Sequence, residues 1–215
     1  MPALTRDSTL DPTRLLLRGG RLCLDFVNTV DPRAGEANRD YLSTYPQLLS
    51  WGVHAGALRA EEGRQLLSHA ADHPRRAGHV VEHASAFREA LHRVLSAAEA
   101  DTSAHEDDLE EVNRTLAGAM AHARVVPDGE GFTWEWDPVA DALDRVLWPV
   151  ARSAADVLTS GELARVRSCA SHDCGWLFLD VSKNRSRRWC TMESCGNRAK
   201  VRRHYARRRR AAARS

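Results

Sequence analysis

The stretches Cys169-Ala170-Ser171-His172-Asp173-Cys174 and Cys190-Thr191-Met192-Glu193-Ser194-Cys195 decide how the last quarter of this chain folds. They hold four of the five cysteines in 215 residues, and fifteen residues separate them. Zn²⁺ prefers four tetrahedral ligands, and two pairs of thiolates complete its shell without an open position. We therefore predict one structural zinc ion per chain, held by Cys169, Cys174, Cys190 and Cys195. Because a full shell leaves no position for water or substrate, this zinc is not expected to be catalytic.

Other interpretations of these cysteines stay open. They could be buried without a ligand, or they could form disulfides, although disulfides are rare in a reducing cytoplasm. His172, inside the first stretch, could replace one thiolate. The N-terminal segment lacks the basic and apolar regions of a signal peptide, and no apolar run approaches the roughly 18 residues of a membrane span. We expect a cytoplasmic protein that does not contact the membrane.

The residues between the two cysteine pairs predict a small zinc-bound finger. Residues 176–179 and 188–189 are strand-like, and they flank a turn-like segment at 182–186. A helix should follow from about Gly196, giving a β-hairpin plus helix of treble-clef-like form. So small a unit lacks a core of its own, and bound zinc would contribute on the order of 10 kcal/mol to its folding.

Charge is distributed unevenly along the chain. Residues 161–215 contain fifteen Lys and Arg against four Asp and Glu, a net charge of +11, whereas residues 1–160 carry −9. We predict a domain boundary near Gly161, with a helical domain at 1–160 and the finger at 161–215. The basic end predicts an anionic partner, although a solubilising tail is an alternative.

Arginine suits this role because its planar fork grips phosphate or the edge of guanine. The helix after Cys195 should dock one face on the hairpin through Val201 and Tyr205, leaving its cations free for DNA, with RNA as an alternative. Arg188 and Arg198, which adjoin cysteines, could instead cap carbonyls or the thiolate shell. The candidate nucleic-acid contacts are Arg185, Arg187, Arg188, Arg198, Lys200, Arg202, Arg203 and Arg207.

The first 160 residues predict a mainly α, multihelical domain with one short β-hairpin. Apolar residues recur at three- and four-residue steps, which is typical of amphipathic helices. Pro149 should kink the last of these helices near Trp148. The hairpin is expected at 124–136, around Asp128-Gly129. The helices are expected from a cap at Ser43-Thr44 to about Gly56, at 60–72, at about 77–100, at about 106–124 and at about 138–159.

One polar cluster stands out in the helical domain, at Asp25, Asn28 and Thr29. Asp25 and Asn28 lie on one face if the segment is helical, and they could bind a small-molecule effector in a cavity of the bundle. Alternatively, they cap the N-terminal segment and tie it to the bundle. The sequence contains no Ser/His/Asp order, glycine-rich phosphate loop or HExxH motif, so we do not expect an enzyme.

Two families share these motifs. Cys195-Gly196-Asn197-Arg198, preceded by Arg188-Trp189-Cys190 and by Cys174-Gly175-Trp176-Leu177-Phe178-Leu179-Asp180, resembles the CGNR zinc finger. Leu24-Asp25-Phe26-Val27-Asn28-Thr29 and Leu48-Leu49-Ser50-Trp51 resemble the ABATE domain, which usually precedes this finger in bacterial proteins. Such proteins are described as stress-induced transcription regulators.

Two functions follow from these observations. The first is a DNA-binding transcription regulator whose helical domain senses a ligand or forms a homodimer. The alternative is a ligand-binding protein or enzyme that acts through the helical domain, with the zinc finger as a structural appendage.

Overall fold

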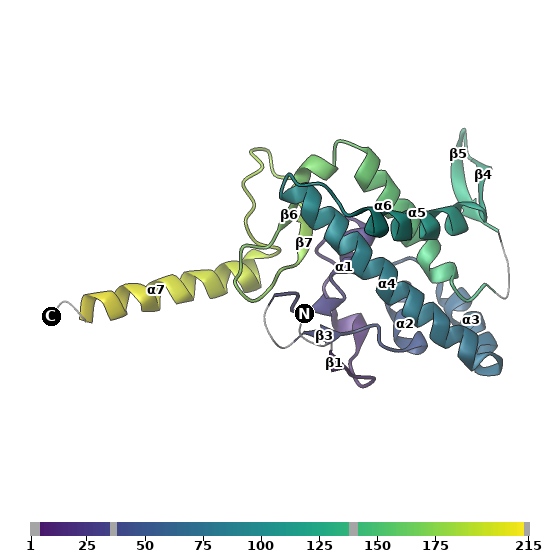
Figure 1. The fold of residues 1–215 in the computed structure, drawn as a ribbon, viewed down its shortest axis with the longest axis horizontal. Helices are drawn as coiled ribbons and strands as arrows, with labels where there is room; N and C mark the ends of the chain where they lie inside the picture. Colours follow the sequence, from purple (N-terminus) through teal and green to yellow (C-terminus); the bar gives the residue numbers. More distant parts are fainter. Residues whose placement is uncertain (1–4, 35–37, 138–141, 213–215) are drawn as a thin grey trace.

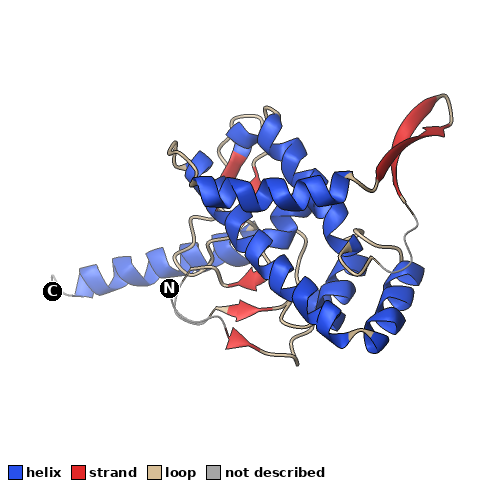
Figure 2. Cartoon of the chain, turned by 45° about the vertical axis from the view of Figure 1, so that its right-hand side comes forward, coloured by secondary structure: helices blue, strands red, loops and turns tan. Residues whose placement is uncertain are grey.

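A computed structural model describes residues 5–34, 38–137 and 142–212 of the chain. The fold is mainly α, as predicted, with three small β-sheets (Figures 1 and 2). The helices are α1 (Leu22–Val27), α2 (Tyr45–His54), α3 (Ala60–Asp72), α4 (Pro74–Glu99), α5 (Glu106–Met120), α6 (Trp148–Thr159) and α7 (Asn197–Ala212). The strands are β1 (Thr5–Arg6), β2 (Val30–Asp31), β3 (Arg39–Asp40), β4 (Ala123–Asp128), β5 (Gly131–Trp136), β6 (Val166–Ser168) and β7 (Leu177–Leu179).

Local capping chemistry sets the bounds of α2, as the sequence predicted. The Thr44 hydroxyl accepts a hydrogen bond from the backbone N–H of Gln47 at 3.3 Å, and the Gln47 side chain accepts one from the Thr44 N–H at 3.1 Å. This reciprocal pair satisfies two donors that a helix start would otherwise leave free. Gly56, at φ +75°, stops the helix in a conformation that other residues rarely adopt.

The last long helix of the body differs from the prediction. α6 begins at Trp148, after a single 3₁₀ turn at residues 145–147, and Pro149 lies in its first turn. A proline there needs no N–H partner and starts the helix, so the predicted kink is wrong. The predicted start near residue 138 falls on residues 138–141, which lie outside the described residues. Likewise α5 ends at Met120, before the predicted residue 124, because β4 already begins at Ala123.

The core of the body forms around α1. The Phe26 ring lies 5.3 Å from that of Trp51 on α2 and 5.7 Å from that of Phe87 on α4, and all three side chains are fully buried. α1 also contacts α6 and β7, so this short helix touches most layers of the domain. Within the described residues, no helix has the length and hydrophobicity that a bilayer crossing requires.

The two elements that project from the body lie at opposite ends of it. The β4–β5 hairpin is formed as predicted, with Val125 opposite Trp134, and it extends from one end (Figure 1). α7 extends from the other end as a single straight helix that projects away from the body (Figures 1 and 2). β1, β3 and β2 form a small third sheet in that order.

The finger shares its core with the body. Val166 on β6 and Leu177 and Leu179 on β7 are buried in the same hydrophobic cluster as α1, α4 and α6. A second, smaller cluster surrounds the four cysteines and includes Trp176 and Phe178. The domain boundary near Gly161 stays a prediction, and the shared core gives the two parts a common interface.

Candidate metal centre and basic helix

The first cysteine pair lies in the turn between β6 and β7. These strands are antiparallel, and the backbone N–H of Cys169 donates to the Trp176 carbonyl at 2.8 Å, which closes the turn. Gly175 has φ +70°, and a Cβ there would lie 3.0 Å from both the backbone N of Ala34 and the Cβ of Arg33. The turn therefore needs glycine, and it packs directly against the body.

The predicted strand partner of β7 is wrong. β7 pairs with β6, which precedes the first cysteine, and not with residues 188–189. The fully buried carboxylate of Asp180 explains the difference, because it accepts from the backbone N–H groups of Ser182 at 2.9 Å and Arg187 at 3.0 Å. These bonds wrap residues 180–187 around the carboxylate, and they outweigh the desolvation of Asp180, so its pKa is lowered.

The second cysteine pair encloses one wide helical turn. Residues Met192–Gly196 form a π-helical turn, and the Thr191 hydroxyl caps it by accepting from the backbone N–H of Glu193 at 3.0 Å. α7 continues from this turn at Asn197, and the Asn197 side chain donates to the Glu193 carbonyl at 3.1 Å. The last cysteine and the base of α7 therefore belong to one rigid segment.

The four predicted ligands come together. The Sγ atoms of Cys169, Cys174, Cys190 and Cys195 all lie within 4.8 Å of one another, and each residue is buried. Sγ separations are 3.7 Å for Cys174–Cys190 and 3.6 Å for Cys190–Cys195. A tetrahedral zinc with bonds of about 2.3 Å requires sulfur atoms about 3.8 Å apart, so the cluster fits this ion. His172 is exposed and outside the cluster.

Hydrogen-bond donors surround the sulfur cluster. The backbone N–H of Cys190 donates to Cys169 Sγ at 3.4 Å, and Arg198 Nη2 donates to Cys195 Sγ at 3.0 Å. Four thiolates around Zn²⁺ leave a net charge of −2, which such donors offset. The contact with Cys195 also raises the pKa of Arg198. The fifth cysteine, Cys23, lies elsewhere in the core, where burial raises its pKa to about 12 and makes the thiol inert.

The three candidate arginines of the loop have different surroundings. Arg187 lies over the Phe178 ring at 4.3 Å and donates to the carbonyls of Trp189, at 3.0 Å, and of Cys190. Its guanidinium thus holds the loop onto the second cysteine pair. Arg185 and Arg188 are exposed, and Arg188 lies over the Trp189 ring at 5.3 Å.

On α7, one side of the helix is attached to the first cysteine turn. Arg202 donates to Asp173 at 3.2 Å and to the Ser171 hydroxyl at 3.2 Å, and Arg198 lies 3.6 Å from Asp173. Burial opposes ionisation of Asp173, but the bonds from Ser171 and Arg202 prevail and lower its pKa. Lys200 and Arg203 are exposed on another side. Arg207 belongs to α7, but its side chain lies outside the described residues.

The predicted docking of α7 through Val201 and Tyr205 is wrong. Val201 is 53% exposed and Tyr205 is 61% exposed. The helix is instead fixed at its base, by its covalent continuity with the π-helical turn and by the contacts of Arg198 and Arg202. These contacts involve only the first turns of α7, and the helix projects beyond them (Figure 1).

Asp25, Asn28 and Thr29 each have partners within the chain. Asn28 is buried, and its amide makes two bonds to the backbone of Leu177: Nδ2 donates to the carbonyl at 2.8 Å, and Oδ1 accepts from the N–H at 2.9 Å. Thr29 donates to the Phe26 carbonyl at 2.7 Å, and Asp25 accepts from the Gly19 N–H at 2.7 Å. These contacts fit the alternative role, in which the three residues tie the N-terminal segment to the rest of the fold. Ligand binding by the three residues stays a prediction.

Two protein-family models match the chain. Residues 20–161 match the model named ABATE, described as "Putative stress-induced transcription regulator". The chain belongs to the ABATE family. Residues 165–208 of this ABATE protein match the CGNR zinc finger, which spans all four clustered cysteines. A search of curated proteins found no match.

The ABATE domain contains a buried ionic network that our sequence analysis missed. Arg88, 1% exposed, donates from Nη1 and Nη2 to the two carboxylate oxygens of Asp40, each at 2.8 Å, and from Nη1 to Thr29 at 3.1 Å. Beside it, Arg33 pairs with Glu89 at 2.6 Å, and the Arg33 backbone N–H donates to the Cys174 carbonyl at 2.8 Å. The network thus reaches from α4 to the first cysteine turn. The available signal was an arginine inside the apolar stripe of α4.

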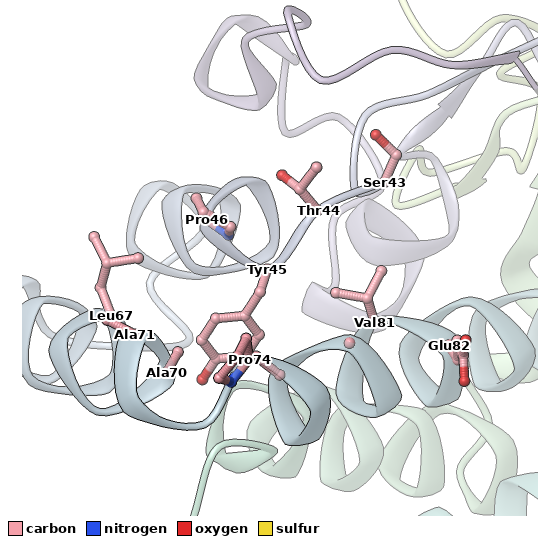
Figure 3. Close-up of a pocket in the computed structure, with 12 residues that line it drawn as sticks. Ser43, Thr44, Tyr45, Pro46, Leu67, Ala70, Ala71, Pro74, Val81 and Glu82 are labelled. Atoms are coloured by element: carbon pink, nitrogen blue, oxygen red, sulfur yellow. The ribbon is translucent and has the colours of Figure 1, made fainter.

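The ABATE domain also contains a cavity of about 540 Å³ between α2, α3 and α4. Figure 3 shows Tyr45 reaching from α2 towards Ala70 and Pro74, with Val81 and Glu82 farther along α4. The hydroxyl groups at its edge are already engaged: Ser43 donates to Gln47, and Tyr45 donates to the Leu143 carbonyl at 2.8 Å. The walls are therefore mainly apolar, and the Glu82 carboxylate is the one charged group among the lining residues.

Proposed function

We propose that this ABATE-family protein is a transcription regulator that binds duplex DNA through α7, with a zinc ion in the four-cysteine centre holding the base of that helix. The observation that carries the proposal is a projecting helix with exposed cations that starts two residues after the last cysteine. The exposed Lys and Arg side chains of such a helix can neutralise phosphates of a duplex. When bound, the metal would contribute folding energy to the finger, and its full thiolate shell gives it a structural role.

The candidate arginines differ in whether their side chains are free to contact DNA or are held by other residues of the chain. Lys200 and Arg203 are exposed and make no ion pair among the described residues. Arg185 and Arg188 are exposed on the loop that precedes the second cysteine pair, where they can bind further phosphates. Arg198 and Arg202 orient the helix through Asp173, and each guanidinium keeps further N–H donors for phosphate. We leave Arg187 out, because its donors serve the loop.

The salt dependence of binding tests this proposal. The full chain would be titrated with a fluorescently labelled duplex of 20 base pairs at several salt concentrations. Each neutralised phosphate contributes a slope of about −0.9 to log K against log salt, so about five contacts give a slope of roughly −4 to −5. Replacing Lys200 and Arg203 by alanine should flatten the slope by up to about two units.

A charge-matched control accompanies this variant. Arg64 on α3 and Arg75 on α4 are two exposed cations, and the Arg64–Glu61 ion pair is solvent-exposed, so replacing both arginines by alanine should preserve folding. This control should keep the wild-type slope, since α3 and α4 lie in the body. Equal loss in both variants would mean that net charge alone attracts DNA. Absence of duplex binding by the wild type at low salt would refute the proposal.

The cavity in the helical domain favours a second function, the sensing of a small apolar molecule. We propose that a neutral apolar compound binds between α2, α3 and α4, because the walls are mainly apolar and the hydroxyl groups are internally bonded. A volume of about 540 Å³ falls within the range of roughly 300–1,000 Å³ of small-molecule sites. The fluorescent probe N-phenyl-1-naphthylamine, which is neutral and apolar, can report on this cavity.

Two glycines offer a matched pair of variants. A Cβ added at Gly78, which lines the cavity, meets nothing within 4 Å, and the same holds for Gly118 on α5. Gly78→Leu should fill the cavity and abolish the probe's fluorescence enhancement, whereas Gly118→Leu should leave it unchanged. Equal enhancement in all three proteins would show that the probe binds elsewhere and would refute this second proposal.

A further inference from the structure

Over residues 197–206 of α7, the exposed side chains form two rows of cations with an uncharged strip between them. At about 100° per residue, Arg198 and Arg202 lie on one flank, and Lys200 and Arg203 lie on another. The residues between these flanks are exposed as well. We call them the uncharged strip: Asn197, Val201, His204 and Tyr205. The strip ends at Arg208, the next position of α7 at the same helical angle.

Two members of the uncharged strip are unusual for a helix so rich in arginine. Val201 and Tyr205 are four residues apart, hence on one face, and both expose more than half of their surface. They do not attach α7 to the finger, because the attachment runs through Arg198, Arg202 and the turn at 192–196. An apolar pair between two cationic rows, on a projecting rod, has no role in folding that the described contacts reveal.

The chemistry of the uncharged strip matches base edges. In the major groove, an amide pairs with adenine, apolar groups contact the thymine methyl, and ring nitrogens and hydroxyl groups meet the remaining donors and acceptors. The cations on the two flanks would then face the phosphates that border the groove. A helix about 10–12 Å across fits a major groove about 12 Å wide, and the 16 residues of α7 extend about 24 Å along it.

We propose that α7 enters the major groove of B-form DNA with the uncharged strip facing the bases, and that Val201 and Tyr205 are the main determinants of sequence preference. This inference rests on the DNA-binding function proposed above and assigns its reading face. The opposite gap between the cationic rows contains Ala199 and Ala206, which offer methyl groups and no hydrogen-bonding group. Duplex RNA fits less well, because the major groove of A-form helices is deep and narrow.

Selection from a randomised duplex library tests the assignment. The zinc-loaded full chain would select from duplexes with a random central segment, and its affinity for the enriched sequence would be compared with that for a scrambled one. We expect the wild type to prefer the enriched duplex by about tenfold or more. Val201→Ala combined with Tyr205→Ala should reduce this preference to about twofold or less while affinity for the scrambled duplex stays within about twofold. Both positions are exposed and alanine favours helix, so the variant keeps its fold, which circular dichroism would check.

Two further variants make the result specific. Lys200→Ala combined with Arg203→Ala should weaken both duplexes alike, since phosphate contacts carry no sequence information. Ala199→Ser combined with Ala206→Ser, on the opposite gap, should leave the preference unchanged. The inference is overturned if the preference survives the change at Val201 and Tyr205, if it shifts with Ala199 and Ala206, if no sequence is enriched, or if duplex RNA binds more tightly than DNA. Each of these outcomes refutes the assigned reading face but is compatible with DNA binding in general. A wild-type protein that binds no duplex would refute the proposed function itself.

Discussion

Replacing Asn28 by alanine should destabilise the protein strongly, because this amide joins α1 to the finger. Both of its bonds go to the backbone of Leu177, at 2.8 and 2.9 Å, and the site is buried. The substitution leaves a buried N–H and a buried carbonyl without partners, and each costs about 1–3 kcal/mol. We expect a loss of about 2–5 kcal/mol in the free energy of unfolding, a large part of the roughly 5–15 kcal/mol typical of a domain.

Urea unfolding followed by tryptophan fluorescence measures this loss. Asn113 is an exposed amide on α5, and Asn113→Ala serves as the control for removing an amide, with an expected change within about 0.5 kcal/mol. Hydrogen exchange at the Leu177 amide should accelerate in Asn28→Ala but not in the control. A change below about 1 kcal/mol for Asn28→Ala, with unaltered exchange at Leu177, would refute the argument that this residue links the two parts of the chain.

Three further predictions concern the metal, the ionic network and pH. X-ray absorption on purified protein should show one zinc per chain with four sulfur neighbours at about 2.3 Å, and a nitrogen or oxygen ligand would contradict the four-thiolate centre. Chelation of the zinc should accelerate hydrogen exchange in β7 and α1 together, while α3 stays protected. Arg88→Met should lower the free energy of unfolding in urea by about 3–5 kcal/mol, because Asp40 would stay buried without its bidentate partner. Adding Asp40→Leu should recover much of this loss, and strictly additive effects of the two substitutions would rule out the coupling. Burial raises the pKa of Asp25 to about 6. Its protonated form therefore stabilises the fold fully below about pH 4, and this contribution, up to about 3 kcal/mol, is lost as the pH rises through 6. Asp25→Asn should abolish this decline in stability, and a pH profile unchanged by the substitution would contradict the prediction.

Much of this architecture is predictable from local sequence signals. The paired spacing of the cysteines indicated the cluster because a metal centre needs its ligands on short turns. The helix bounds followed from caps and breakers, such as Thr44 and Gly56, whose chemistry acts within a few residues. The ABATE and CGNR resemblances were confirmed by the matches at residues 20–161 and 165–208.

The remaining features depend on contacts between distant residues. Asp180 looked like an ordinary polar residue after a strand, and only its burial explains why residues 180–187 form a loop and not a strand partner for β7. Arg88 lies in the stripe of α4 between Ala84 and Leu91, which marks it as buried, but nothing nearby in the sequence identifies Asp40 as its partner. Val201 and Tyr205 had the spacing of a docking face, yet no surface faces them in the fold.

Genome-wide recovery of DNA bound to the tagged protein tests the central claim most directly. Cells producing the full chain would be compared with cells producing the Lys200→Ala, Arg203→Ala variant at equal abundance. We predict that the wild type enriches a discrete set of sites sharing one sequence, and that the variant loses this enrichment while its zinc content stays at one per chain. Recovery of no DNA above the level of the variant would contradict the assignment of α7 as a DNA-binding helix.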